Sequence, residues 1–174
     1  MIDNSYLILD KRIELKGIIF EDFVNYKKPS MTLMFPKCDF KCDYECGESW
    51  CQNWELAAAP SQMVNIKELL EQYKSNPITE AIVLQGLEPL DSLIDVCFVA
   101  ACLANLKIAD DLVIYTGYTK TEVPMHTIYQ IAEIIPGNLI MKWGRFKPRH
   151  TPHYDPVLGV KLASDNQYGE LITK

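Results

Sequence analysis

Short apolar runs recur along the chain at Met31–Phe35, Ala81–Leu84, Leu112–Tyr115 and Leu139–Met141. Such runs, continuous rather than alternating with polar residues, are typical of strands that are buried on both faces of a parallel sheet. The pattern therefore predicts four central strands. Pro36 ends the first of them, because proline cannot donate a hydrogen bond to a strand ladder.

Helical patterns separate these strands. Asn65 is a suitable N-cap for a helix over 66–75, because its side chain can accept a hydrogen bond from the first turn. The mostly apolar segment 92–107 predicts a well-buried helix. Segment 121–135 predicts another, with Pro124 tolerated in its first turn. Alternating strands and helices indicate an α/β fold with parallel strands.

The two ends of the chain have weaker patterns. Residues 6–9 and 13–20 alternate enough to predict an opening strand or hairpin. The segment 143–156 is rich in proline and is expected to be irregular, and a short terminal pair is expected around 157–162 and 171–173.

Length and composition indicate one globular domain over residues 1–174, with a cysteine loop at 36–60 and an irregular C-terminal segment at 143–174. The formal net charge of −6 argues against nucleic-acid binding, which needs an excess of Lys and Arg. We find no apolar run near 18 residues and no secretory signal, so we expect a cytoplasmic protein that does not enter a membrane.

Four of the six cysteines, Cys38, Cys42, Cys46 and Cys51, lie in one short stretch. Closely spaced thiolates are soft ligands that can surround one metal centre. Disulfides are disfavoured in a cytosolic chain, where thiols stay reduced. The spacing leaves open a four-cysteine zinc knuckle or an iron–sulfur cluster.

The two other cysteines, Cys97 and Cys102, fall in the apolar helix and are expected to be core residues. They do not supply the second cysteine pair that is common in structural zinc sites.

Three unusual turns follow the predicted strands. The cysteine loop follows the first strand, Gly86–Glu88 follows the second and Thr116–Tyr118 follows the third. Ligands of open α/β sheets bind beyond the carboxyl ends of the strands. We therefore expect thiols, an acid and a glycine turn on one rim of the sheet.

The cysteine loop resembles the radical S-adenosylmethionine (SAM) signature C-x3-C-x2-C. Cys38 and Cys42 match its first half. An aromatic residue precedes Cys51 and Asn53 follows it by two positions, as at the usual end of the motif. This alignment requires an insertion before Cys51, and Cys46 within that insertion is the alternative third ligand.

Further segments are similar to the anaerobic (class III) ribonucleotide reductase activating enzymes. Gln85–Leu90 is similar to the Gly-Gly-Glu-Pro segment, with Leu87 in place of the second glycine, and Tyr115–Thr119 to the Tyr-Thr-Gly-Tyr-Thr segment. Lys142–Phe146 and Ala163–Gln167 are similar to two segments near the C-terminus.

The resemblance implies a fold and an activity. The fold would be a partial (β/α) barrel with a mostly parallel sheet. A [4Fe–4S] cluster with one open iron would cleave SAM and generate a glycyl radical on anaerobic ribonucleoside-triphosphate reductase, with flavodoxin or ferredoxin as electron donor. Alternatives are a radical SAM enzyme with another substrate and a non-catalytic zinc-binding module.

The resemblance also implies roles for individual residues. The cluster ligands would be Cys38, Cys42 and Cys51, with Cys46 as the alternative third ligand. SAM would be bound by Asn53, Gly86, Glu88, Thr116 and Gly117.

Overall fold

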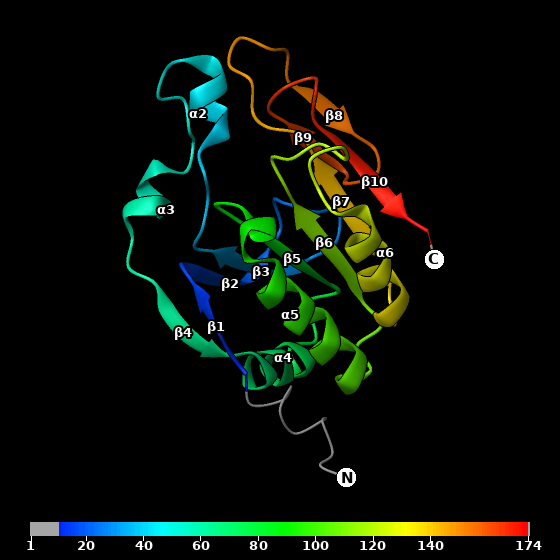
Figure 1. Cartoon of the computed structure of the whole chain (residues 1–174). Helices are drawn as coiled ribbons and strands as arrows, with labels where there is room; N and C mark the ends of the chain where they lie inside the picture. The colour runs from blue at the N-terminus through cyan, green and yellow to red at the C-terminus, as the bar shows by residue number, and fades with distance from the viewer. Residues whose placement is uncertain (1–10, 174) are drawn as a thin grey trace.

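The structure, a computed structural model, describes residues 11–173, so the strand predicted at 6–9 lies outside the described residues. Its centre is a six-stranded sheet (Figure 1). The strands, in spatial order, are β10 (Tyr168–Ile172), β7 (Leu139–Trp143), β6 (Asp111–Tyr115), β5 (Ala81–Gly86), β3 (Ser30–Phe35) and β2 (Gly17–Asp22). The four predicted central strands are therefore confirmed as elements.

The sheet is open and mixed, so the predicted partial (β/α) barrel is wrong. β3, β5, β6 and β7 run parallel to one another. β2 pairs with β3 and β10 pairs with β7, and both pairings are antiparallel. These two strands occupy the edges of the sheet and end the parallel run on each side. A (β/α) barrel is built from parallel strands, whereas antiparallel strands form both edges of this sheet.

Two small sheets accompany the central one. β1 (Arg12–Leu15) pairs with β4 (Gln62–Asn65), and β8 (His153–Asp155) pairs with β9 (Val160–Leu162). The opening strands β1 and β2 therefore belong to different sheets and do not form a hairpin with each other. The predicted terminal pair is also wrong, because β10 pairs with β7 instead of with β9. The C-terminal segment is more regular than predicted.

The helices follow the predicted order. Their bounds are α2 (Lys41–Cys46), α3 (Trp54–Ala58), α4 (Ile66–Ser75), η1 (Pro89–Ser92), α5 (Leu93–Leu106) and α6 (Met125–Ile134). Asn65 caps α4 as predicted, since its Oδ1 accepts a hydrogen bond from the Glu68 N–H at 3.2 Å. α6 begins later than predicted because Pro124 is its N-cap residue. α2 and α3 lie within the cysteine loop, which the sequence did not predict to be helical.

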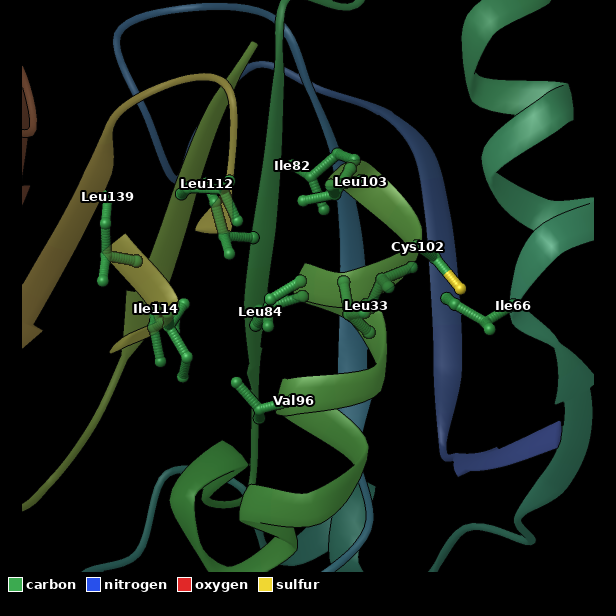
Figure 2. Packing of buried hydrophobic residues seen from close by; sticks show 14 of the residues in the cluster. Leu33, Ile66, Ile82, Leu84, Val96, Cys102, Leu103, Leu112, Ile114 and Leu139 are labelled. Atoms are coloured by element: carbon green, nitrogen blue, oxygen red, sulfur yellow. The ribbon is translucent and has the colours of Figure 1, made fainter. Parts of the chain in front are cut away.

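Both faces of the central sheet are buried, which explains the continuous apolar runs. Leu33, Leu84 and Ile114 pack with residues of α4 and α5 on one face (Figure 2), and the same cluster includes residues of α6. Val83 and Val113, one position out of phase, pack on the opposite face under the β8–β9 region. Because side chains alternate along a strand, every second residue of each run serves one layer.

The helix α5 lies in the core. Cys102 is buried and Cys97 packs against the same cluster, as expected for structural cysteines. The segment Pro89–Leu106 is long and apolar enough to cross a membrane, contrary to the expectation that no such run exists. A core helix passes the same test of length and composition. Val96 and Val99 are fully buried in the fold, so this helix is weak evidence for a membrane.

Candidate functional site

A cavity of about 450 Å³ lies at the carboxyl ends of the parallel strands. Cys38 and Cys42 reach it from the segment after β3. Residues 86–88 reach it from the end of β5, residues 116–118 from the end of β6, and residues 144–146 from the end of β7. The parallel direction of four strands thus brings four connecting segments to one place.

Three of the four clustered cysteines share this cavity. Cys38, Cys42 and Cys51 line it. Cys46, the last residue of α2, lines a second cavity of about 340 Å³ between the insertion and the segment around Phe146. Spacing alone left Cys46 and Cys51 as rivals, and the geometry favours Cys51 as the partner of the first two.

The thiols of Cys38 and Cys42 are held in their neutral form in the absence of a cation. Burial raises the pKa of Cys38 to about 12 and that of Cys42 to about 11, and the Cys51 thiol beside Cys42 raises the latter further. Neighbouring acids, including Glu88 beside Cys38, act in the same direction. A bound metal would supply the positive charge that thiolates in this environment require.

The thiols are spread more widely than a single zinc ion requires. Among residues 11–173, the compact group of possible ligands consists of Cys38, Asp39 and Asp91, whose ligand atoms lie within 4.8 Å of one another. The clustered cysteines do not form such a group. Four sulfurs around one zinc ion would lie about 4 Å apart, given Zn–S bonds of about 2.3 Å. An iron–sulfur cluster is larger than a single zinc ion, so the cysteine sulfurs that bind it lie farther apart.

Two stacked aromatic rings connect the beginning and the end of the cysteine loop. The rings of Phe40 and Trp54 lie parallel, with centroids 4.7 Å apart. Phe40 stands between Cys38 and Cys42, and Trp54 begins α3 shortly after Cys51. The stack therefore brings the residues after Cys51 back to the first cysteine pair.

Glu88 is a buried carboxylate in the cavity wall, with 4% of its surface exposed. Its Oε2 accepts a hydrogen bond from the Gly117 N–H at 2.7 Å, and its Oε1 accepts one from the Leu90 N–H at 3.0 Å. Burial nevertheless raises the pKa of Glu88 to about 7, because desolvation outweighs the hydrogen bonds. A cationic ligand would therefore stabilise the ionised form of Glu88.

Lys142 is a second buried charge in the same cavity, and sequence reasoning missed it as a site residue. Burial lowers the pKa of Lys142 to about 8, against the attraction of Glu88. Its Nζ donates a hydrogen bond to the Gly144 carbonyl at 2.7 Å. A lysine at the carboxyl end of an otherwise apolar buried strand was the available signal, since lysine is seldom buried without a partner.

The backbone conformation at position 86 requires a glycine. Its φ is +107°, and a Cβ atom there would lie 2.6 Å from the Phe35 nitrogen. The neighbouring strand therefore approaches too closely for any other residue. Asn53 donates a hydrogen bond from Nδ2 to the Gly86 carbonyl at 3.0 Å, which connects the end of the cysteine motif to β5. Leu87 also lines the cavity.

The turn after β6 is placed by the neighbouring elements. The Thr116 N–H donates to the Lys142 carbonyl at 2.8 Å, and the Thr116 Oγ1 accepts from the Tyr118 N–H at 3.0 Å. The Tyr118 hydroxyl donates to Asp91 Oδ1 at 2.6 Å. With the Gly117–Glu88 bond, these contacts bring Thr116 and Gly117 to the same cavity as Gly86, Glu88 and Asn53.

The segment after β7 is held by the polar residues near the C-terminus. Asn166 donates from Nδ2 to the Arg145 carbonyl at 2.8 Å, and Gln167 donates from Nε2 to the Gly144 carbonyl at 3.2 Å. Arg145 binds Glu122 through both terminal nitrogens and approaches Glu45 of the insertion at 3.5 Å. Arg145 therefore connects the cysteine loop to the body of the protein.

Comparison with known proteins adds no family to this description. No protein-family model, no curated protein and no solved structure matches the chain. The resemblance to the radical SAM enzymes therefore rests on the motifs and on the site itself, and it stays a prediction.

Proposed function

We propose that this protein is a radical SAM activase that generates a glycyl radical on anaerobic ribonucleoside-triphosphate reductase. The observation that carries the proposal is the composition of one cavity. Three thiols from a single loop face a buried carboxylate and a buried ammonium group there, while the fourth thiol lies elsewhere.

The donor set fits a [4Fe–4S] cluster with three protein ligands. Cys38, Cys42 and Cys51 would bind three irons and leave the fourth open. Thiolates are the usual protein ligands of such clusters. No disulfide joins the cysteines among residues 11–173, and a reduced, cytoplasmic environment would keep the clustered thiols available as ligands.

The charged residues of the cavity suit the amino-acid end of SAM, which carries an ammonium and a carboxylate group. Glu88 offers an acceptor for the ammonium group, and Lys142 offers a cation for the carboxylate. Thr116 and Gly117 would line the adenosine side, and Asn53 and Gly86 would shape the approach between them. The volume of about 450 Å³ lies within the usual range of small-molecule sites.

The chemistry belongs to the cofactors. When bound, the cluster held by Cys38, Cys42 and Cys51 would supply the electron for reductive cleavage of SAM, and so for removal of a hydrogen atom from the substrate. The residues of this chain bind and orient these groups. They need to supply no general base, because a hydrogen atom rather than a proton is removed.

A protein substrate is compatible with the mouth of the cavity. Val24 lines the cavity and leaves 76% of its surface exposed, and the adjacent Phe23 leaves 64% exposed. Exposed apolar residues beside a site are typical of protein contacts. A backbone glycine of the reductase would enter here, with flavodoxin or ferredoxin supplying the electron.

The proposal is tested by anaerobic reconstitution with iron and sulfide. We expect a [4Fe–4S] absorbance and electron paramagnetic resonance signal, formation of 5′-deoxyadenosine from SAM under reducing conditions, and a glycyl radical signal on added reductase. SAM cleavage without a glycyl radical would indicate a different substrate. One stoichiometric zinc ion, with no iron or sulfide bound, would overturn the enzyme assignment and favour a zinc-binding module.

A further inference from the structure

The insertion before Cys51 raises a geometric problem. Residues 43–50 separate Cys42 from Cys51, whereas Cys42 and Cys46 lie one turn apart on the same helix, α2. Without a restraint, Cys51 would sample many positions, and confining a loop to one of them has an entropic cost. Cys46, much closer in sequence to Cys42, would then compete for the same metal.

Asp43 supplies the restraint. Its Oδ1 accepts a hydrogen bond from the Cys51 N–H at 2.7 Å and another from the Trp50 N–H at 2.8 Å. The carboxylate that immediately follows the second cysteine thus holds the backbone of the third. Hydrogen bonds to an ionised acceptor are shorter and stronger than those between neutral groups.

The backbone of Asp43 takes part in the same turn. Its carbonyl accepts a hydrogen bond from the Gly47 N–H at 2.9 Å, which ends α2. Gly47 has a φ of +71°, a left-handed conformation that reverses the chain. Asp43 therefore controls both the point where the helix ends and the point where the returning chain arrives.

The second carboxylate oxygen of Asp43 is buried. Within residues 11–173, Asp43 Oδ2 has no hydrogen-bond partner. Burial of an unsatisfied carboxylate oxygen is unfavourable. Asp43 has this unfavourable buried oxygen and also two bonds to the backbone of Trp50 and Cys51. We therefore expect its side chain to fix the position of that backbone.

We infer that Asp43 is a positioning residue that selects Cys51 over Cys46 as the third thiol of the site. Asp43 acts through the backbone of Cys51 and is not itself a ligand. The identity of the bound group rests on the proposed function, whereas the selection between two thiols depends only on the fold of this loop.

Three variants test the inference. Asp43→Ala removes the two acceptor bonds to the backbone and a long contact from the Cys42 thiol at 3.9 Å, and Asp43→Asn keeps a carbonyl oxygen that can accept all three. Glu48→Ala is the matched control, because Glu48 is an acid of the same insertion whose bond goes to the Trp50 side chain at 2.7 Å and not to the backbone. Circular dichroism and thermal unfolding verify that each variant is folded.

The first measurement uses no metal. The apo protein is oxidised with a limiting amount of diamide, and the disulfides are mapped by mass spectrometry. We expect Cys42–Cys51 to predominate in the wild type, Asp43→Asn and Glu48→Ala. In Asp43→Ala the ratio of Cys42–Cys51 to Cys42–Cys46 should fall at least fivefold. A wild-type protein that forms mainly Cys42–Cys46 would overturn the inference even if Asp43→Ala failed to fold.

The second measurement is iron and sulfide content after anaerobic reconstitution. We expect a severalfold loss in Asp43→Ala, recovery in Asp43→Asn and no loss in Glu48→Ala. Wild-type content in Asp43→Ala, or equal loss in Asp43→Ala and Glu48→Ala, would contradict the role of Asp43. If the wild type failed to cleave SAM, the proposed function would fail, yet the disulfide ratio would still decide the inference.

Discussion

The difference in the free energy of unfolding between the variant Glu88→Gln and the wild type should shift in favour of the variant as the pH rises from 5 to 7. Glu88 is 4% exposed, and burial raises its pKa from 4.5 to about 7. Between these two values the folded state keeps a proton that the unfolded state releases. The free energy of unfolding therefore falls as the pH rises through this window, and the loss is complete above the folded-state pKa.

The magnitude follows from the size of the pKa shift. At about 1.4 kcal/mol per pKa unit, the buried charge costs about 3 kcal/mol in total, and about 2 kcal/mol of this develops between pH 5 and 7. Glutamine keeps one oxygen acceptor, but the N–H of Gly117 or of Leu90 then faces an amide NH2 group instead of an oxygen, which costs about 1–2 kcal/mol at every pH. Glu88→Gln should thus be destabilising at pH 5 and neutral or stabilising at pH 7.

Urea unfolding of the wild type and the variant at both pH values measures this double difference. Glu122→Gln is a suitable control, because Arg145 holds the pKa of Glu122 down at about 2 and this carboxylate does not titrate in the window. In a Lys142→Met background the effect should grow, since the nearby cation favours ionised Glu88. A double difference below about 0.5 kcal/mol, or of opposite sign, would refute the reasoning.

The same substitution should impair function. Under the proposed function, glutamine would offer no negative charge to the ammonium group of SAM, so the Kd of the reconstituted protein for SAM should rise at least tenfold, about 1.4 kcal/mol. A variant that is more stable at pH 7 and binds SAM more weakly would indicate that Glu88 serves the ligand at the expense of the fold.

Three further predictions concern the loop, the strand end and the charged cluster. Cys51→Ala should lose the iron–sulfur absorbance while Cys46→Ala keeps it, and the reverse result would reassign the third ligand. Gly86→Ala should lower the free energy of unfolding by at least about 2 kcal/mol, because of its positive φ and the contact with the adjacent strand; an unchanged urea midpoint would contradict this. Arg145→Lys should cost about 1 kcal/mol and restore the pKa of Glu122 toward its ordinary value, measurable by NMR titration, since lysine cannot form the two-pronged contact.

Local patterns were sufficient for the elements of the core. The runs that became β3, β5, β6 and β7 were recognised because a strand buried on both faces has few polar positions. Asn65 was recognised as an N-cap because capping depends on neighbours along the chain. The common direction of these strands also allowed the convergence of the cysteine loop, 86–88 and 116–118 to be expected.

The edges of the sheet could not be predicted in the same way. β2 and β10 are short, half-exposed strands whose pattern does not specify a partner. Their antiparallel pairing with β3 and β7 depends on which edge is free after the core has assembled. The expected barrel failed for this reason, because closure is a property of the edges and not of the central strands.

For this protein, the sequence by itself determined which residue types stand at the carboxyl ends of the strands: four thiols, Glu88 and a glycine turn. Only the tertiary structure decided which of them meet. It brought Cys51 to Cys38 and Cys42, turned Cys46 toward another cavity, and buried Lys142 beside Glu88. The physical reason is that spacing limits how far apart residues can lie, whereas hydrogen bonds and burial between distant segments select one arrangement within that limit.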